Sequence, residues 1–259
     1  GNAGTVNTGA IDPLEKLSMI SKKYNLWFHV DGAIGTVVKL LPEFENELEG
    51  LELADSVAFD LHKWLYINYE VACVLIRDSE THKAAFSQQA DYLAKHERGL
   101  ASGPDSFSFY GMELSRNFKS LKVWMNLKEH GIDQYREMIR KNIGQAFYVA
   151  DEIHRSDFLE LMAPCVLNIV CFRYHPAECN DDNFLNKLNK EILMTLHERG
   201  SVAPSYTILN NRYALRISIT NHRTKTKHLQ KLIDEVLKTG HEILNKLGKD
   251  PKAGVNSLH

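Results

Sequence analysis

Two short runs with strand character enclose a polar break, and this arrangement limits the possible folds more than any other stretch of the chain. The runs cover residues 56–59 and 71–76, and the break between them contains Asp60, His62 and Lys63. In α/β proteins, ligands bind beyond the carboxyl ends of the strands, so a lysine held at such an end is a candidate for chemistry. A lysine taken by itself is usually a solvated surface charge. The assignment of Lys63 therefore depends on the residues that accompany it.

The composition is that of an ordinary globular protein. The 259 residues carry a formal net charge of −2, with 44% hydrophobic and 25% charged residues. This balance gives no electrostatic reason to expect nucleic acid or a membrane surface as a partner, and no apolar run approaches the ~20 residues of a membrane span. The four cysteines include no C-x-x-C pair, which predicts reduced core thiols and a cytoplasmic location.

Helix and strand signals alternate near the start of the chain. Asp12 is placed to cap a helix that has Pro13 in its first turn and ends near residues 24–25. Residues 26–30 then predict a short strand that ends at Asp31. Alternating strands and helices predict an α/β fold with a mostly parallel sheet, and a carboxylate at the end of a strand faces the ligand-binding crevice.

Residues 87–111 show little periodicity of apolar residues and contain three glycines and a proline. A loop of this length within a compact domain is typically a functional lid or a disordered segment, and Tyr92 is the residue in its first half that is suited to chemistry. The elements predicted after this loop are helices over 116–129 and 132–155, a strand over 165–174, a helix over 181–199, a hairpin of strands 202–209 and 212–220, and a helix over 225–247.

Four features together resemble the group II pyridoxal-phosphate-dependent amino-acid decarboxylases. They are the motif AGTVNTGAIDPL at residues 3–14, HVDGA around Asp31, DLHKW around Lys63, and the spacing of 32 residues between this aspartate and this lysine. The resemblance covers residues 1–247. It implies the α/β fold of aspartate aminotransferase, which is fold type I of the pyridoxal-phosphate enzymes.

The resemblance also implies a division of the chain. Residues 1–130 correspond to the carboxyl-terminal part of the large cofactor-binding domain with its catalytic loop 87–111, residues 131–247 to a small α+β domain, and residues 248–259 to a flexible tail. Family members have a long upstream segment that carries the phosphate-binding serine or threonine and much of the substrate pocket. The chain is therefore expected to be the carboxyl-terminal part of an enzyme, either as a fragment or beside a separate N-terminal chain.

Four residues receive roles from the resemblance. Lys63 would form the Schiff base with pyridoxal 5′-phosphate, and Asp31 would keep the ring nitrogen of the cofactor protonated. A carboxylate about 4 Å from that nitrogen favours the proton by about 4 kcal/mol at an effective dielectric constant near 20. Ala33 matches the small residue against the ring face, and His62 matches the histidine near the Schiff base and the phosphate.

Three further positions concern the phosphate, the ring oxygen and the loop. Asp60 stands where relatives often have a phosphate-contacting asparagine, although an acid beside a phosphate is unfavourable unless it is bridged. Val6 replaces the second threonine of the family pattern GTT, which leaves Thr5 or Thr8 to supply the hydroxyl for the ring oxygen. The position of Tyr92 implies a general acid that protonates the α-carbon after decarboxylation.

The implied activity is decarboxylation of an L-amino acid to an amine and carbon dioxide. An aromatic substrate is slightly favoured because Trp64 and Tyr92 resemble the aromatic branch. A related aldehyde synthase is the alternative enzyme, although the loop tyrosine is typically replaced there. A non-catalytic scaffold or regulatory fragment of the same fold is the alternative from another class. Both the decarboxylase and the non-catalytic scaffold are expected to form a homodimer.

A metal site is the other alternative for the polar residues near Lys63. His29, Asp31 and His62 are residue types that bind zinc, but their spacing fits no zinc motif. His29 is expected instead to point to the face of its strand opposite Asp31.

Overall fold

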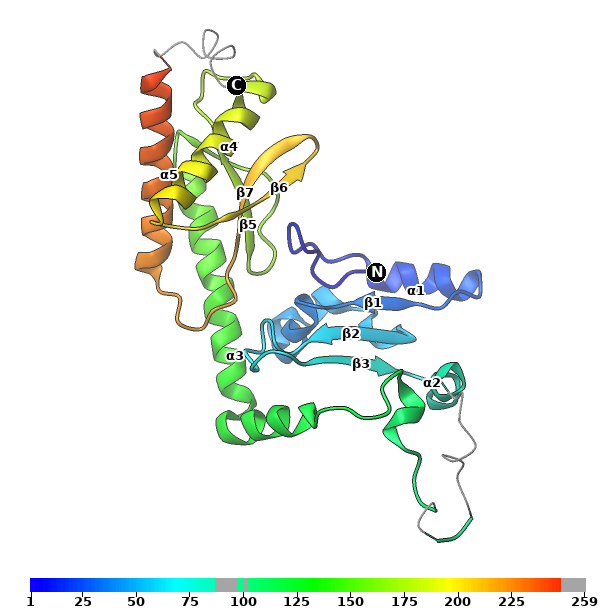
Figure 1. Cartoon of the computed structure of the whole chain (residues 1–259). Helices are drawn as coiled ribbons and strands as arrows, with labels where there is room; N and C mark the ends of the chain where they lie inside the picture. The colour runs from blue at the N-terminus through cyan, green and yellow to red at the C-terminus, as the bar shows by residue number, and fades with distance from the viewer. Residues whose placement is uncertain (87–96, 100–101, 248–259) are drawn as a thin grey trace.

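The computed structural model describes residues 1–86, 97–99 and 102–247, and in this part of the chain two β-sheets are connected by a long helix (Figure 1). The helices are α1 (Leu14–Lys23), α2 (Ser79–Phe86), α3 (Lys119–His154), α4 (Asp182–Arg199) and α5 (Thr226–Lys246). The first sheet contains β1 (His29–Asp31), β2 (Ser56–Asp60) and β3 (Ala72–Ile76), and the second contains β4 (Leu159–Leu161), β5 (Ile169–Tyr174), β6 (Ser205–Leu209) and β7 (Arg212–Ser218). Within the described residues no helix has the length and hydropathy needed to cross a membrane.

The first helix, α1, starts without the predicted cap. Its N-cap residue is Pro13, and no side chain among the described residues caps its first turn. The Asp12 carboxylate instead accepts hydrogen bonds from the backbone N–H and the side-chain amide of Asn2, at 2.7 and 2.9 Å. The predicted capping role of Asp12 is therefore wrong, because the N-terminal segment occupies its oxygen. The end of α1 at Lys23 agrees with the predicted end near residues 24–25.

The first sheet is mixed rather than mostly parallel. β1 pairs with β2 in parallel, with Asp31 opposite Ala58. β3 runs antiparallel to β2, with Asp60 opposite Ala72. The predicted parallel pairing is confirmed for β1 and β2. It is wrong for β3, which is antiparallel to β2. A parallel crossover needs about a dozen residues or more, usually with a helix, and the turn-rich connection 61–71 contains no helix, so β3 returns antiparallel.

One face of the first sheet packs against a hydrophobic core. Val30 of β1 and Val57 of β2 are paired and belong to the same cluster as the short 3₁₀ turns between residues 35 and 53. Side chains alternate between the two faces of a strand. Asp31 and Asp60 therefore belong to the opposite face, which lies away from this core.

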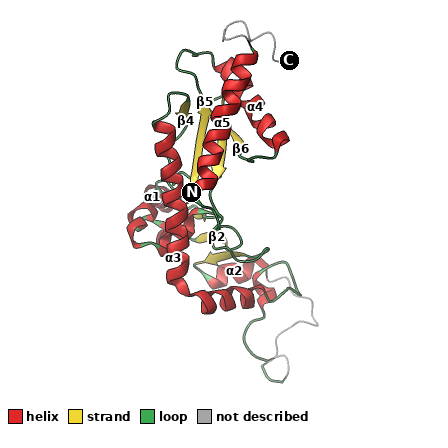
Figure 2. Cartoon of the chain, turned by 90° about the vertical axis from the view of Figure 1, so that its left-hand side faces the viewer, coloured by secondary structure: helices red, strands yellow, loops and turns green. Residues whose placement is uncertain are grey.

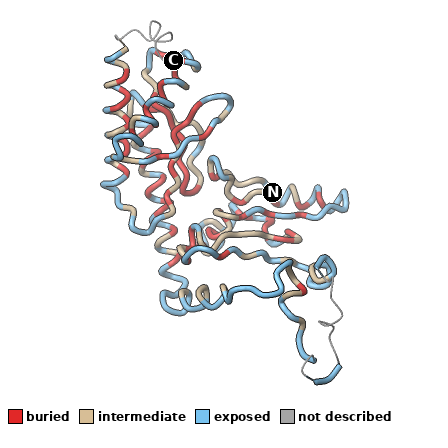
Figure 3. The backbone as a smooth tube through the Cα atoms, in the orientation of Figure 1, coloured by how far each residue is buried: buried red, intermediate tan, exposed pale blue. Residues whose placement is uncertain are grey.

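The long helix α3 changes direction at Gly131, where backbone angles of φ 69° and ψ 160° interrupt the helical geometry (Figure 1). This confirms the predicted separation into two helices at this residue. Before the bend, Leu121, Trp124 and Met125 are exposed. After the bend, buried residues such as Ile139 pack against the sheets, and Figure 3 shows the corresponding change from exposed to buried backbone.

Gly131→Ala is expected to lower the free energy of unfolding by on the order of 1–3 kcal/mol, because only glycine adopts these backbone angles without strain. An added Cβ meets nothing within 4 Å, so steric contact does not contribute. Gly144 lies in the regular part of α3 and also has nothing within 4 Å. Gly144→Ala is therefore the matched control and is expected to raise the stability by about 1 kcal/mol. Urea denaturation measures both changes, and equal destabilisation of the two variants would contradict the strain at Gly131.

The second sheet is antiparallel with the order β4-β5-β7-β6. Helices α4 and α5 and the second part of α3 share its core, and Figure 2 shows them packed beside the sheet. The Asp181 carboxylate caps α4, and Gly200 ends it with a φ of 64°. Asn210 and Asn211 have φ angles of 51° and 63°, as a two-residue type I′ hairpin requires. The predicted helix and hairpin are confirmed, whereas β4 was not predicted.

Candidate active site

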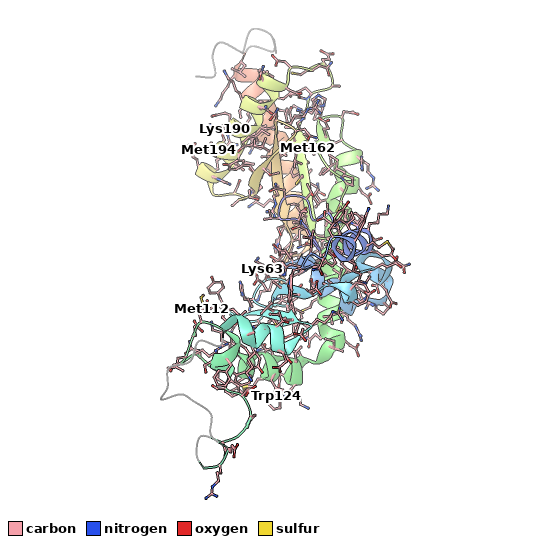
Figure 4. The ribbon with its side chains drawn as sticks, turned by 90° about the vertical axis from the view of Figure 1, so that its right-hand side faces the viewer. Lys63, Met112, Trp124, Met162, Lys190 and Met194 are labelled. Atoms are coloured by element: carbon pink, nitrogen blue, oxygen red, sulfur yellow. The ribbon has the colours of Figure 1, made fainter. Side chains whose placement is uncertain are left out.

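Lys63 lies in the turn that follows β2, and its side chain is 40% exposed. Figure 4 places it at the edge of the first sheet that faces the second sheet. Its Nζ atom lies 2.6 Å from Oδ2 of Asp60, the last residue of β2. An exposed ion pair of this kind contributes at most about 1 kcal/mol to stability, so its main effect is to hold the amine at the strand end. In this structure Asp60 is the counterion of Lys63.

Asp31 lies on the neighbouring strand and faces the same side of the sheet. It pairs with Ala58, and Asp60 lies two residues beyond Ala58 on the same face. The Asp31 Oδ1 atom accepts a hydrogen bond of 3.0 Å from the backbone N–H of Ala33, and the residue itself is exposed. The fold therefore brings the predicted carboxylate to the same face as Asp60, the ion-pair partner of the predicted amine, although Asp31 and Lys63 are 32 residues apart in the sequence.

His29 shares this face with Asp31, because residues two apart on a strand point to the same side. Both are exposed, whereas Val30 between them is buried. The expectation that His29 faces away from Asp31 is therefore wrong. Its Nδ1 atom lies 2.7 Å from Oγ of Ser56. Among the described residues no group of three His, Cys, Asp or Glu side chains could hold a metal ion, so the zinc alternative with His62 gains no support.

His62 is anchored to the start of β3. Its Nδ1 atom lies 2.7 Å from the carbonyl oxygen of Val71 and 3.1 Å from the N–H of the same residue. The imidazole ring also makes an edge contact with Tyr69, with ring centroids 4.7 Å apart. These contacts fix the ring next to Lys63 and leave Nε2 as the nitrogen for a ligand.

Thr5 closes a tight turn that precedes α1. Its Oγ1 atom lies 3.0 Å from Oγ1 of Thr8 and accepts a hydrogen bond of 3.1 Å from the N–H of Ala10. Two residues earlier, the Ala3 N–H donates to the carbonyl oxygen of Asp31. This turn therefore lies beside the end of β1. Both hydroxyls that were predicted to replace the one missing at Val6 are located in it.

Arg216 connects the second sheet to this turn and was missed by sequence reasoning. Its guanidinium donates to the carbonyl oxygens of Val6 and Asn7, at 2.6 and 3.1 Å, and to Oγ of Ser205 at 3.3 Å. Burial lowers its pKa. The sequence contains one signal that could have indicated Arg216, because this arginine interrupts the apolar residues of strand β7. It brings a positive charge from the second sheet to the turn beside β1.

A buried thiol supports the same junction. Cys171 of β5 donates from Sγ to the carbonyl oxygen of Asn7 at 3.1 Å. Burial raises the pKa of this thiol to about 11, so it stays protonated and inert near neutral pH. The four cysteines are free, as predicted. The predicted general acid, Tyr92, lies outside the described residues.

Comparison with known proteins identifies the family. The family model for the pyridoxal-dependent decarboxylase conserved domain matches residues 1–175. The chain belongs to the pyridoxal-dependent decarboxylase family. This confirms the resemblance that the motifs around Asp31 and Lys63 carry.

Individual members of the decarboxylase family match most of the chain. An aromatic-L-amino-acid decarboxylase from Bacillus atrophaeus is 33% identical over 93% of this chain and 50% of its own length. Tyrosine decarboxylase 3 from Petroselinum crispum is 32% identical over 87% of this chain and 44% of its own length. The chain therefore spans about half the length of these relatives.

Solved structures of the family confirm the predicted fold type I. The crystal structure of Oryza sativa TDC with PLP and tryptamine matches with a TM-score of 0.87 and 25% identity, over 93% of this chain and 50% of that chain. Catharanthus roseus tryptophan decarboxylase in complex with L-tryptophan matches with a TM-score of 0.82 and 26% identity, over 93% of this chain and 48% of that chain. The mixed first sheet and the antiparallel second sheet are thus parts of one known α/β architecture.

Proposed function

We propose that this chain is part of a pyridoxal-phosphate-dependent carboxy-lyase that converts an aromatic L-amino acid to its amine and carbon dioxide. The observation that carries the proposal is that Lys63, in the turn after β2, is ion-paired with Asp60, and that Asp60 shares one face of adjacent strands with Asp31, in a chain of this family. The aromatic class follows the activities for which the relatives from Bacillus and Petroselinum are named.

The side chains of this face suit pyridoxal 5′-phosphate. The Lys63 amine is accessible and lies at a strand end, where it would attach the cofactor through its aldehyde. The Asp31 carboxylate is exposed and would hold a proton on the ring nitrogen. Ala33 is small enough to leave room for the ring. When bound, the cofactor withdraws the electrons released as the carboxylate group departs.

Three neighbouring residues would complete the cofactor site. Asp60 orients the Lys63 amine by the ion pair described above. His62 would offer Nε2 to the bound cofactor, since its Nδ1 is engaged by the backbone of Val71, the residue before β3. Thr5 would offer its hydroxyl to the ring oxygen from the turn beside β1.

The substrate class is tested by measuring carbon dioxide release from a panel of L-amino acids. Tyrosine, tryptophan and phenylalanine are expected to be consumed faster than glutamate or cysteine sulfinate. Preference for an acidic amino acid would overturn the aromatic assignment and leave the decarboxylase assignment intact.

Tyr92→Phe is expected to leave cofactor attachment at Lys63 intact while reducing amine formation by about 10²- to 10⁴-fold, the usual contribution of a general acid. Its hydroxyl is the proposed proton donor to the α-carbon after carbon dioxide leaves. Amine and aldehyde are quantified together by chromatography, because loss of this proton donor is expected to divert product to aldehyde. An unchanged amine yield would remove Tyr92 from the mechanism.

An aldehyde synthase is the second candidate function. Phenylacetaldehyde synthase from Petunia hybrida is 30% identical over 87% of this chain and 46% of its own length. Tyr92 favours the decarboxylase, because the resemblance associates replacement of the loop tyrosine with aldehyde synthases. Aldehyde as the main product of the unaltered chain would reverse this preference.

We also propose a cytoplasmic homodimer, and a separate N-terminal chain as an additional candidate partner. The exposed Leu121, Trp124 and Met125 before the bend of α3 provide an apolar surface that supports self-association. The four free cysteines support a reducing compartment. Size-exclusion chromatography at micromolar concentration tests the dimer, and native mass spectrometry weighs any second chain.

A further inference from the structure

A fully buried asparagine on α3 contacts the segment that carries Lys63. The Asn142 Oδ1 atom accepts hydrogen bonds from Nε1 of Trp64 at 3.1 Å and from the hydroxyl of Tyr66 at 2.7 Å. Trp64 and Asn142 are both 0% exposed. An indole N–H can only donate, so the Asn142 atom that faces it must be the oxygen. One side chain of α3 thus holds the residues one and three positions after the lysine.

The backbone at Tyr66 needs such support. Its φ is 57°, in the left-handed region that a residue with a bulky side chain rarely adopts. Such a conformation persists only when the surrounding contacts determine it. The Tyr66 N–H donates to the carbonyl oxygen of Lys63, so the shape of this turn sets the position of the lysine. Burial raises the pKa of Tyr66, which keeps its hydroxyl a neutral donor to Asn142.

The other end of the Asn142 amide reaches the loop that follows β7. Its Nδ2 atom donates to Oε1 of Gln145 at 3.1 Å and to the carbonyl oxygen of Asn221 at 3.3 Å. Gln145 in turn donates to the carbonyl oxygen of Thr224 at 2.8 Å. Asn142 therefore links the segment that carries Lys63 to the loop that follows β7, the strand that carries Arg216.

We propose that Asn142 is a positioning residue that sets the location of the Lys63 amine relative to the second sheet. Asn142 is fully buried and acts through its hydrogen bonds with Trp64 and Tyr66. The inference rests on the proposed function of Lys63 and deepens it, because it identifies what fixes the reactive amine in place.

Asn142→Leu tests the inference, with Asn189→Leu as the matched control. Asn189 is also 0% exposed and hydrogen-bonds the backbone of Tyr174 in β5 and of Leu185 in α4. Both changes remove a buried amide of the same size, but only the first removes the partner of Trp64. Tyr66→Phe removes one of the two donors to Asn142 and serves as the partial variant.

Two measurements on the full chain separate positioning from general destabilisation. The first is hydrogen exchange of the Trp64 indole N–H by NMR. The second is the rate at which pyridoxal phosphate and borohydride label Lys63, followed by peptide mapping. Asn142→Leu is expected to accelerate the indole exchange and to slow Lys63 labelling, each by about tenfold, the loss associated with one hydrogen bond. Tyr66→Phe is expected to slow labelling less, and Asn189→Leu to leave both rates unchanged.

Labelling of Asn142→Leu at the rate of the unaltered chain would overturn the inference. Equal slowing in Asn189→Leu would also overturn it, because the effect would then be general destabilisation. Absence of selective Lys63 labelling in the unaltered chain would overturn the proposed function together with this inference, and is thereby distinguished from the first two outcomes.

Discussion

Replacement of Lys63 by alanine is expected to abolish covalent attachment of pyridoxal phosphate and to reduce decarboxylation by at least about 10⁴-fold, as removal of a covalent catalyst does. The amine at the end of β2 is the group that would bond to the cofactor, and alanine offers no nucleophile. Lys63→Ala also removes the ion pair with Asp60, which is exposed and contributes at most about 1 kcal/mol to stability. The variant should therefore fold normally. Absorbance of the bound cofactor and amine production are the measurements.

Two control variants isolate the amine of Lys63 from its charge. Lys63→Arg keeps a cation next to Asp60 but has no primary amine, and it is expected to be as inactive as Lys63→Ala. Lys83 is a second ion-paired lysine, with Nζ 2.7 Å from Oδ2 of Asp105. Lys83→Ala is expected to retain activity, since this residue lies on α2, which follows β3 at the edge of the sheet opposite the carboxyl end of β2. Retained cofactor absorbance in Lys63→Ala would place the attachment at another lysine.

Asp31→Asn is expected to lower the decarboxylation rate by about a thousandfold, which corresponds to about 4 kcal/mol. This is the interaction energy of two unit charges about 4 Å apart at an effective dielectric constant near 20. The amide keeps an oxygen for the N–H of Ala33, so the turn after β1 should be retained. Cofactor attachment at Lys63 should persist, and the loss should appear in kcat.

Asp78 provides the matched control for Asp31. It follows β3 and also accepts a backbone hydrogen bond, from the N–H of Thr81 at 2.6 Å. Asp78→Asn therefore tests loss of a strand-end carboxylate outside the candidate site and is expected to leave kcat unchanged. If Asp31→Asn lowers the rate no more than Asp78→Asn does, Asp31 does not hold the proton on the ring nitrogen.

Local signals predicted much of the fold. The two consecutive asparagines predicted the hairpin of β6 and β7, because asparagine tolerates the positive φ angles that a two-residue hairpin turn requires. Both residues have positive φ angles in the structure. Gly131 predicted the bend of α3 for the same kind of reason. The helix predicted over 181–199 agrees with α4, where the structure shows Asp181 as the N-cap and Gly200 at the end. Each of these features depends on interactions within a few residues, which the sequence displays directly.

Features that depend on distant residues were missed. Trp64 and Asn142 are 78 positions apart, and Arg216 and Val6 are 210 positions apart. No periodicity indicates such pairs. The assignment of a cap to Asp12 failed for a related reason, because Asn2 competes for its carboxylate from a segment that pairs with β1.

The candidate site was predictable where it coincides with strand ends. Lys63 and Asp31 each follow an apolar run, and parallel pairing of β1 with β2 places Asp31 on the same face as Asp60, the ion-pair partner of Lys63. The contacts of Trp64 and Tyr66 with Asn142 were not predictable, since Asn142 comes from α3 and its other partner is the loop beyond β7. Sequence reasoning therefore proposed the reactive groups, and the structure adds the contacts around the segment that carries Lys63.

The most direct test of the central claim is reduction of the cofactor-loaded protein with borohydride, followed by peptide mapping with mass spectrometry. Reduction makes the bond between the lysine amine and the cofactor permanent, so the attachment site is read from the modified peptide. The account predicts a single pyridoxyl group on the peptide that contains Lys63. Modification spread over exposed surface lysines, or an unmodified Lys63 peptide, would contradict it.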